Sequence, residues 1–433
     1  MTDKTGNALL DWRDALSLIV CHVSRPSPVS VPLEQALGLI AVQDIYSPMD
    51  LPFFTSSALD GFAVRATDVA QASPGSPAVL RIVGEARAGT PFRGTIKRGQ
   101  AVEIMTGAPV PLGADTIVRV EDTELSSPQM VRIFAAPPCG TGVRPAGLDV
   151  RKEQKLLSKG EIFNPGVLGL LAGVGIGNVL VWPRPRVTIV TTGDELVDPV
   201  VEKLHPDSGR IFDSNSIILS ALLKDMGCID TAVRRAPDDP SALKELLSAD
   251  APHCDILLLS GGVSKGKYDY VRSVFRDLGG TEIFWGVNQQ PGKPLFFGLL
   301  RSTAVFGLPG NPVSAYFCAD IYVRTAVRHA LGVNGPTPFE FLAIAGEDFE
   351  KGDSRTSFRR CILKAEGRKV FAFSAGRPDS NLIHTVTRHS GYLVIEPQRA
   401  RLREGEPTAC LIPEPARLWP EPLKALLLTL NVL

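Results

Sequence analysis

The stretch DILLLSGGVSKGKYDY, residues 255–270, constrains the fold of this chain more than any other. Its apolar run, 255–259, is short and continuous, which is typical of a strand buried on both faces of a parallel sheet. Gly261 and Gly262 follow directly. Glycines let the backbone turn sharply while their N–H groups stay available to an anion. We therefore expect either a phosphate-binding turn or a glycine-rich strand-to-helix turn that holds no ligand.

The same stretch nearly matches the phosphate-binding P-loop, because Gly261 is followed after four residues by Gly266 and Lys267. Tyr268, however, stands where that motif requires a Ser or Thr to bind magnesium. The hydroxyl group is part of the P-loop mechanism. The P-loop interpretation is therefore rejected.

Length and composition exclude several classes of protein. The chain has 433 residues, enough for about three domains. With 44% hydrophobic residues, 21% charged residues and zero net charge, nothing favours nucleic acid or an anionic membrane as a partner. The seven cysteines are scattered singly and have no zinc-site spacing, which is typical of a reducing compartment. No segment has the length of a membrane span or the pattern of a signal peptide, so we expect a cytoplasmic protein.

The apolar pattern divides the chain into four parts. We expect a helical and β-rich module over 1–180, an α/β domain over 181–333, a small β domain over 334–415 and an apolar tail over 416–433. The expected fold class is multidomain α/β, with a central doubly wound parallel-sheet domain between the β-rich N-terminal module and a small C-terminal β-barrel. The glycines within 173–177 do not indicate a dinucleotide site, because they precede a strand instead of following one.

Three predicted strands of the α/β domain end in glycine beside small polar or acidic residues. These ends lie at residues 192–195, 260–264 and 309–312. Ligands bind doubly wound sheets outside the carboxyl ends of the strands, so we expect one crevice lined by all three. Carboxylates beside an anion site suggest a bridging cation, and oxygen ligands of this kind suit Mg²⁺.

Two helices of this domain carry asparagine near their start. A helix over 217–226 is expected to have Ser214 or Asn215 as its N-cap. A longer helix over 312–331 is expected to be capped by Asn311. We expect Asn311 to act as a helix cap and not in catalysis.

Eight motifs follow one another along the chain: LPFFTSSALDGFAV (51–64), IMTGAPVPLGADTIVRVED (104–122), VRPAGLDV (143–150), TTGDELV, GRIFDSNSIILSALL, SGGVSKGKYDY, QPGKP and GLPGNPVSA. In this order they resemble the molybdopterin molybdenumtransferase family, enzymes of molybdenum-cofactor biosynthesis that include the E domain of gephyrin. The resemblance covers most of the chain. One such motif is weak evidence, whereas eight in order are strong evidence.

The resemblance implies that the protein transfers molybdate to adenylylated molybdopterin and releases AMP and the molybdenum cofactor. It also implies a magnesium-dependent homodimer and possible delivery of the substrate by a molybdopterin adenylyltransferase. In this interpretation the glycine turns hold the nucleotide and its phosphates, and acidic residues hold the magnesium ion.

The resemblance and the expected crevice together give candidate roles to individual residues. The implied catalytic residues are Asp60, Asp149, Glu195, Asp269 and Lys293. Of these, Glu195 and Asp269 would bind the metal. The implied substrate-binding residues are Thr106, Gly193, Asp239, Ser260, Gly261, Gly262, Ser264, Pro309, Pro312 and Arg360.

Plainer roles compete with these assignments. Asp60 also fits the turn residue of an Asp-Gly pair. Asp149 and Asp239 also fit solvated loop acids, Asp194 a helix cap, and Lys293 an ordinary surface lysine.

The chain departs from the family pattern at Gln290, where lysine is usual, at Leu148, and in the segment SAGRPDSNLIHTV. These departures leave open a scaffold that binds the pterin nucleotide without catalysis. The central domain taken alone also leaves open a nucleotide pyrophosphatase, although the long N-terminal module argues against it.

Overall fold

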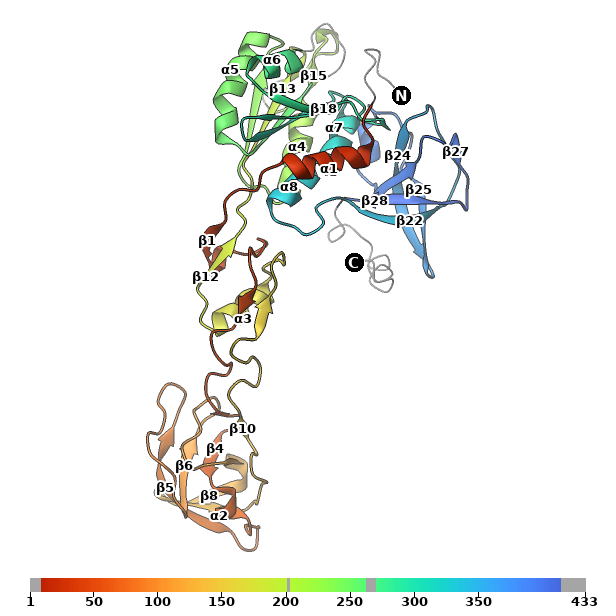
Figure 1. Cartoon of the computed structure of the whole chain (residues 1–433). Coiled ribbons are helices and arrows are strands. Elements are labelled where there is room, and N and C mark those ends of the chain that lie inside the picture. The colour runs from red at the N-terminus through yellow and green to blue at the C-terminus, as the bar shows by residue number, and fades with distance from the viewer. Residues whose placement is uncertain (1–8, 201–202, 262–269, 414–433) are drawn as a thin grey trace. The chain divides into compact units, whose positions relative to one another are not determined.

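The computed structural model describes residues 9–200, 203–261 and 270–413. The chain forms two compact units (Figure 1). Of the described residues, those within 9–30, 38–42 and 180–413 form the larger unit, and residues 31–37 and 43–179 form the smaller unit. No helix in the described ranges combines the length and the apolar character needed to cross a bilayer.

The larger unit is built on a six-stranded sheet in the order β16-β13-β17-β21-β20-β18. Its strands are β13 Val187–Thr192, β16 Thr231–Ala236, β17 Ile256–Ser260, β18 Thr281–Trp285, β20 Phe296–Leu300 and β21 Thr303–Leu308. The first four strands in the order are parallel neighbours, whereas β20 runs antiparallel to β18 and β21. Only Arg301 and Ser302 join β20 to β21, which is too short for a parallel crossover. The sheet is therefore mixed rather than purely parallel.

Helices cover both faces of this sheet, as a doubly wound domain requires. They are α4 Ser214–Asp225, α5 Pro240–Asp250, α6 Val271–Asp277, α7 Pro312–Cys318 and α8 Arg324–Ala330. In β17, Ile256 and Leu258 pack into the core that includes α4, α7 and α8, while Leu257 and Leu259 pack into the core under α5 and α6. Alternate residues of a strand point to opposite faces, so a continuous apolar run serves both cores.

The first helix, α1 Trp12–His22, packs into the larger unit. Asp11 caps it by accepting a hydrogen bond from the Arg13 amide at 2.8 Å. Its buried face includes Trp12, whose ring meets Phe358 edge to face with 5.4 Å between centroids. Phe358 belongs to the C-terminal barrel, so α1 contributes to the packing of both parts of this unit.

The C-terminal part of the larger unit is a closed five-stranded barrel. Its strands are β22 Phe339–Ala345, β24 Thr356–Glu366, β25 Lys369–Ser374, β26 Gly391–Ile395 and β28 Pro407–Ile412. The barrel closes because β24 pairs with both β25 and β26. The short strand β19 Gln289–Gln290 adds to β24 in parallel. The fold class expected from the sequence, with a central α/β domain, a β-rich module and a small barrel, is confirmed.

The smaller unit contains a six-stranded sheet in the order β7-β4-β6-β5-β9-β8. Its strands are β4 Gly61–Val64, β5 Ala78–Ala86, β6 Gln100–Ile104, β7 Thr116–Arg119, β8 Thr123–Ser127 and β9 Met130–Ile133. At Gly61 φ is +156°, and an added Cβ would lie 1.9 Å from the Val118 carbonyl oxygen. The position therefore requires glycine.

The remaining elements are short. They are α2 Ala66–Val69, α3 Pro165–Gly173, β1 Val29–Pro32, β2 Ile45–Tyr46, β3 Ser56–Ser57, β10 Val143–Arg144, β11 Lys155–Leu157, β12 Asn178–Val181, β14 Leu196–Val197, β15 Ile211–Phe212, β23 Phe349–Glu350 and β27 Arg401–Leu402. Two of them, β14 and β15, pair with each other in parallel just after β13 and just before α4.

A buried polar network joins the α/β domain to the barrel. Asp320 lies in a π-helical turn between α7 and α8 and accepts hydrogen bonds from Arg324. Its other carboxylate oxygen accepts from the Tyr392 hydroxyl at 3.0 Å, and His389 Nε2 lies 3.0 Å from the same hydroxyl. Burial lowers the pKa of His389 despite the nearby Asp320 carboxylate. The imidazole is therefore favoured in its neutral form in the folded protein.

We predict that stability falls as pH drops below about 6.5, the ordinary pKa of histidine. In that range the unfolded chain takes up a proton at His389 that the folded chain resists, which favours unfolding. Urea unfolding at pH 7.5 and 5.5 measures this loss, and His389→Gln should make it smaller. His329, whose pKa is also lowered by burial, should preserve part of the effect.

The control is the substitution His253→Gln, because His253 is exposed. An equal loss of stability in wild type and in His389→Gln would contradict the role given to His389.

Candidate active site

The crevice predicted from the sequence lies where the strand order of the sheet reverses. From β13 the chain passes to β16 on one side and then to β17 on the other, so the switch point lies between β13 and β17. Doubly wound sheets bind ligands at this point, outside the carboxyl ends of the strands. The residues found there are Thr192 at the end of β13 with Gly193 after it, and Ser260 at the end of β17 with Gly261 after it.

Gly261 is required by the packing of these two strand ends. Its φ is +100°, and an added Cβ would lie 2.8 Å from both the carbonyl oxygen and Oγ1 of Thr192. The Thr192 hydroxyl is buried and has no hydrogen-bond partner in the part of the chain that the structure describes. A close backbone approach beside an unsatisfied hydroxyl is suited to a ligand that carries hydrogen-bonding oxygens.

Glu195 stands at the exposed edge of the same turn. Its carboxylate folds back over Gly193, where φ is +145° and an added Cβ would lie 2.7 Å from Glu195 Oε2. Within the described residues the Glu195 side chain makes no hydrogen bond or ion pair. The neighbouring Asp194 does not cap a helix but accepts a hydrogen bond from the Asp238 amide at 3.2 Å. Asp194 therefore ties the loop after β13 to the loop after β16.

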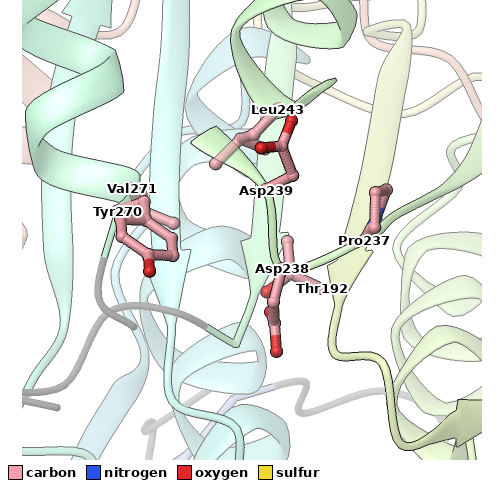
Figure 2. Close-up of a pocket in the computed structure, with 7 residues that line it drawn as sticks. All are labelled: Thr192, Pro237, Asp238, Asp239, Leu243, Tyr270 and Val271. Atoms are coloured by element: carbon pink, nitrogen blue, oxygen red, sulfur yellow. The ribbon is translucent and has the colours of Figure 1, made fainter. Parts of the chain in front are cut away.

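Asp239 lines a small pocket next to the crevice (Figure 2). The pocket is formed by Thr192, Pro237, Asp238, Asp239, Leu243, Tyr270 and Val271. Asp239 is the N-cap of α5, and its carboxylate accepts from the Ala242 amide at 2.7 Å. Its placement thus fits both a capping residue and a residue at the edge of a ligand site.

A buried aspartate that the sequence analysis missed organises the start of α4. The prediction of Ser214 or Asn215 as the N-cap is wrong, because Asp213 caps this helix through a bond from the Ser216 amide at 3.0 Å. The other carboxylate oxygen of Asp213 accepts from Thr191 Oγ1 at 3.0 Å and lies 3.3 Å from Arg235 Nε. Asp213 therefore joins α4 to strands β13 and β16.

The third strand end, after β21, adjoins the second. An added Cβ on Gly310 would lie 3.9 Å from the Gly261 Cα. Pro309 is buried beside it, and Pro312 opens α7. All three strand ends predicted to share a crevice are thus linked, since Gly261 touches Thr192 on one side and Gly310 on the other.

Lys293 is exposed and follows a buried turn that is held by a hydrogen bond from Gln289. Gln289 is fully buried, donates from Nε2 to the Gly292 carbonyl at 3.2 Å and accepts a hydrogen bond from the Tyr322 hydroxyl. Gly292 has φ of +85°, which favours glycine. The Lys293 side chain makes no ion pair or hydrogen bond among the described residues. The turn supported by Gln289 therefore presents the Lys293 ammonium group without a partner among the described residues.

Gln290 pairs in register with Ser357 of β24. Gln290 Oε1 and Ser357 Oγ are both buried and have no hydrogen-bond partner in the described ranges. These neutral polar groups can form hydrogen bonds to a ligand or to water.

Arg360 is buried in the barrel and forms hydrogen bonds to a loop that contacts the start of α7. Its Nη2 donates to the Arg377 carbonyl at 2.9 Å, and burial lowers its pKa from the ordinary arginine value. In the same loop, Ser380 accepts from the Val313 amide at 3.2 Å and from Asn311 Nδ2 at 3.0 Å. Asn311 thus occupies the N-cap position of α7, but its side chain donates to the barrel loop instead of capping.

Two candidate residues of the smaller unit are bonded to each other. Asp60 is exposed, and its Oδ1 accepts from the Thr106 amide at 2.6 Å and from the Thr106 hydroxyl at 2.8 Å. Both hydrogen bonds lower the pKa of Asp60, and the bond from the Thr106 amide has the larger effect. Asp149 lies in an exposed loop, and its side chain contacts no polar partner within the described residues. The candidates Gly262, Ser264 and Asp269 lie outside the described residues.

The architecture defines a class: a multidomain protein whose doubly wound domain has glycine turns at its switch point and is joined to a C-terminal barrel. Comparison with known proteins narrows this class. Residues 10–175 match the MoeA N-terminal region (domain I and II), residues 188–329 a probable molybdopterin binding domain, and residues 343–411 the MoeA C-terminal region (domain IV).

Named relatives of the chain are consistent with these family matches. The chain is 36% identical over 375 residues to molybdopterin molybdenumtransferase 2 of Mycobacterium tuberculosis, covering 85% of this chain and 91% of that protein. It is 32% identical to the molybdopterin molybdenumtransferase of Haemophilus influenzae, covering 86% and 91%. The crystal structure of a molybdopterin biosynthesis MoeA protein from Pyrococcus horikoshii matches with a TM-score of 0.79 at 31% identity, over 94% of this chain and all of that one. The chain belongs to the molybdopterin molybdenumtransferase family.

We predict that Thr106→Val raises the pKa of Asp60 toward its usual 3.8, because the hydroxyl donor is lost while the side chain keeps its shape. The rise should be incomplete, since the Thr106 amide still donates. Carbon-13 NMR titration of the Asp60 carboxyl group measures the change. Thr123→Val, which removes a hydroxyl that donates to Val120, is the control. No rise in Thr106→Val would contradict the assignment.

Proposed function

We propose that this protein inserts molybdate into adenylylated molybdopterin, with cleavage of the phosphoanhydride bond and release of AMP and the molybdenum cofactor. The observation that carries the proposal is the crevice at the switch point of the sheet, where two glycine turns meet beside an unpaired carboxylate. Membership of the molybdopterin molybdenumtransferase family supports the same reaction, since its members are named for it.

The turns at Gly193 and Gly261 would receive the nucleotide and its phosphates. Backbone N–H groups at such turns bind anions without a Cβ in the way. Gly310 and the prolines at 309 and 312 would form the adjoining wall, and Asp239 the edge of the pocket beside Thr192. Fixed donors of this kind lose little entropy when the ligand binds.

Cationic groups would receive molybdate and the phosphate charge. Lys293 offers an ammonium group that has no partner among the described residues, and Arg360 a guanidinium whose pKa is lowered by burial. A cation whose charge has no partner in the protein is stabilised most by a bound anion, because hydrogen bonds between charged partners are stronger than those between neutral ones. Gln290 and Ser357 would add neutral polar contacts in place of a second lysine.

A magnesium ion fits the donor set of the crevice in part. Glu195 is an exposed carboxylate without a protein partner among the described residues, and Mg²⁺ is commonly held by one or two carboxylates, substrate phosphates and water. No group of three or more His, Cys, Asp or Glu side chains suited to a metal was found in the described ranges. Glu195 would hold the ion together with the substrate and with Asp269. When bound, the ion would neutralise developing phosphate charge.

We predict that the purified protein releases AMP from adenylylated molybdopterin when molybdate and magnesium are present. Glu195→Ala should lower the rate of release by about 100-fold, in line with the loss of a group that stabilises transition-state charge. Chromatographic measurement of AMP tests this, and circular dichroism checks that the variant is folded. Glu245→Ala, an exposed change on α5, is the matched control.

Substrate that stays intact after prolonged incubation with wild type would overturn the catalytic proposal. If the intact substrate is nevertheless bound, the protein is a scaffold of the same fold, as the neutral Gln290 would favour.

We further propose that the protein acts as a homodimer in the cytoplasm and receives its substrate from a molybdopterin adenylyltransferase. In the dimer, Asp60 and Thr106 of one subunit would complete the crevice of the other, together with Asp149. Sedimentation at micromolar concentration should give twice the chain mass of 46.5 kDa. A monomer under those conditions would contradict this arrangement.

A further inference from the structure

One residue at the start of α4 contacts two of the three strand ends that form the crevice. Asn215 donates from Nδ2 to Ser260 Oγ at 2.9 Å and to the Gly310 carbonyl oxygen at 2.8 Å. Ser260 ends β17, and Gly310 follows β21. One amide group therefore fixes the distance between two neighbouring turns.

The orientation of this amide follows from its partners. The Gly310 carbonyl oxygen can only accept a hydrogen bond, so the –NH₂ group of Asn215 must face it. Asn215 Oδ1 then points elsewhere, and it is buried without a partner in the described part of the chain. Ser260 Oγ accepts from the amide, so its own proton is left to be donated away from Asn215. The amide thus sets the direction of the Ser260 hydroxyl.

The backbone that carries Asn215 is itself held in place. Asp213, two residues earlier, is fully buried and is bonded to Thr191 of β13 and to the Ser216 amide. The Asn215 amide is consequently anchored to the end of β13 while it contacts the ends of β17 and β21. All three walls of the crevice are connected through this short segment.

We propose that Asn215 is a positioning residue of the active site. It holds the turns at Gly261 and Gly310 at the spacing that the nucleotide phosphates need, and it orients the Ser260 hydroxyl toward them. The proposal rests on the proposed function for the identity of the ligand. It assigns to Asn215 a role distinct from helix capping, which Asp213 performs.

The test uses the full chain and the variants Asn215→Ala and Asn215→Asp. Both remove the two N–H donors, and Asp keeps the size of the side chain. We expect the Kd for AMP in the presence of magnesium to rise about tenfold in each, as the loss of two ordinary hydrogen bonds would give. Amide hydrogen exchange should accelerate in peptides covering 256–261 and 306–311 and not elsewhere. Asn178→Asp, the same change at an exposed position of β12, should alter neither quantity.

A double-mutant cycle separates positioning from general damage. If Asn215 acts through Ser260, then Ser260→Ala should weaken AMP binding clearly in wild type but little in the Asn215→Ala background. In AMP-release assays the KM of the Asn215 variants should rise more than kcat falls.

Unchanged exchange at both turns, or fully additive effects of the two substitutions, would overturn the proposal. If the Asn215 substitutions have these effects but the wild-type protein releases no AMP, the catalytic function is overturned and the positioning role stands. Normal AMP release by every Asn215 variant would overturn the positioning role and leave the catalytic function standing.

Discussion

Burial of the central parallel strands on both faces is the constraint on which the larger unit depends. Every residue of β17, Ile256–Ser260, is buried, and alternate side chains enter two different cores. Such a strand has no exposed face on which polar chemistry could lie. The polar residues are therefore confined to the strand ends, where glycine allows the chain to turn and the backbone N–H groups to face a ligand. The crevice is a consequence of the core.

The barrel matters to the site because it touches the crevice edge and supplies buried cations. Its loop around Ser380 bonds to Asn311 and Val313 at the start of α7, and the same loop accepts a bond from Arg360. Burial lowers the pKa of Arg360, whose guanidinium donates to backbone carbonyls of this loop. The proposed anionic substrate would add a charged partner for this guanidinium.

Sequence reasoning succeeded where a pattern is local. The apolar run ending in glycine predicted the β17 strand, and the structure places the three predicted strand ends next to one another. It failed at Asp213 and at the partners of Asn215, because capping depends on the backbone angles of a single residue and the Asn215 contacts span 45 and 95 residues. The buried hydrogen bond between Gln289 and Tyr322 beneath the Lys293 turn could not be predicted either, because these residues are also far apart in sequence.

The sequence by itself determined the fold class, the family and the types of residue at each strand end, since apolar periodicity and motif order are written along the chain. Only the tertiary structure decided which of these residues meet. Contacts such as those of Gly261 with Thr192, Asn215 with Gly310, and Asp60 with Thr106 join residues that are distant in sequence. Their pairing follows from strand order and register, which are properties of the assembled sheets and of no single segment.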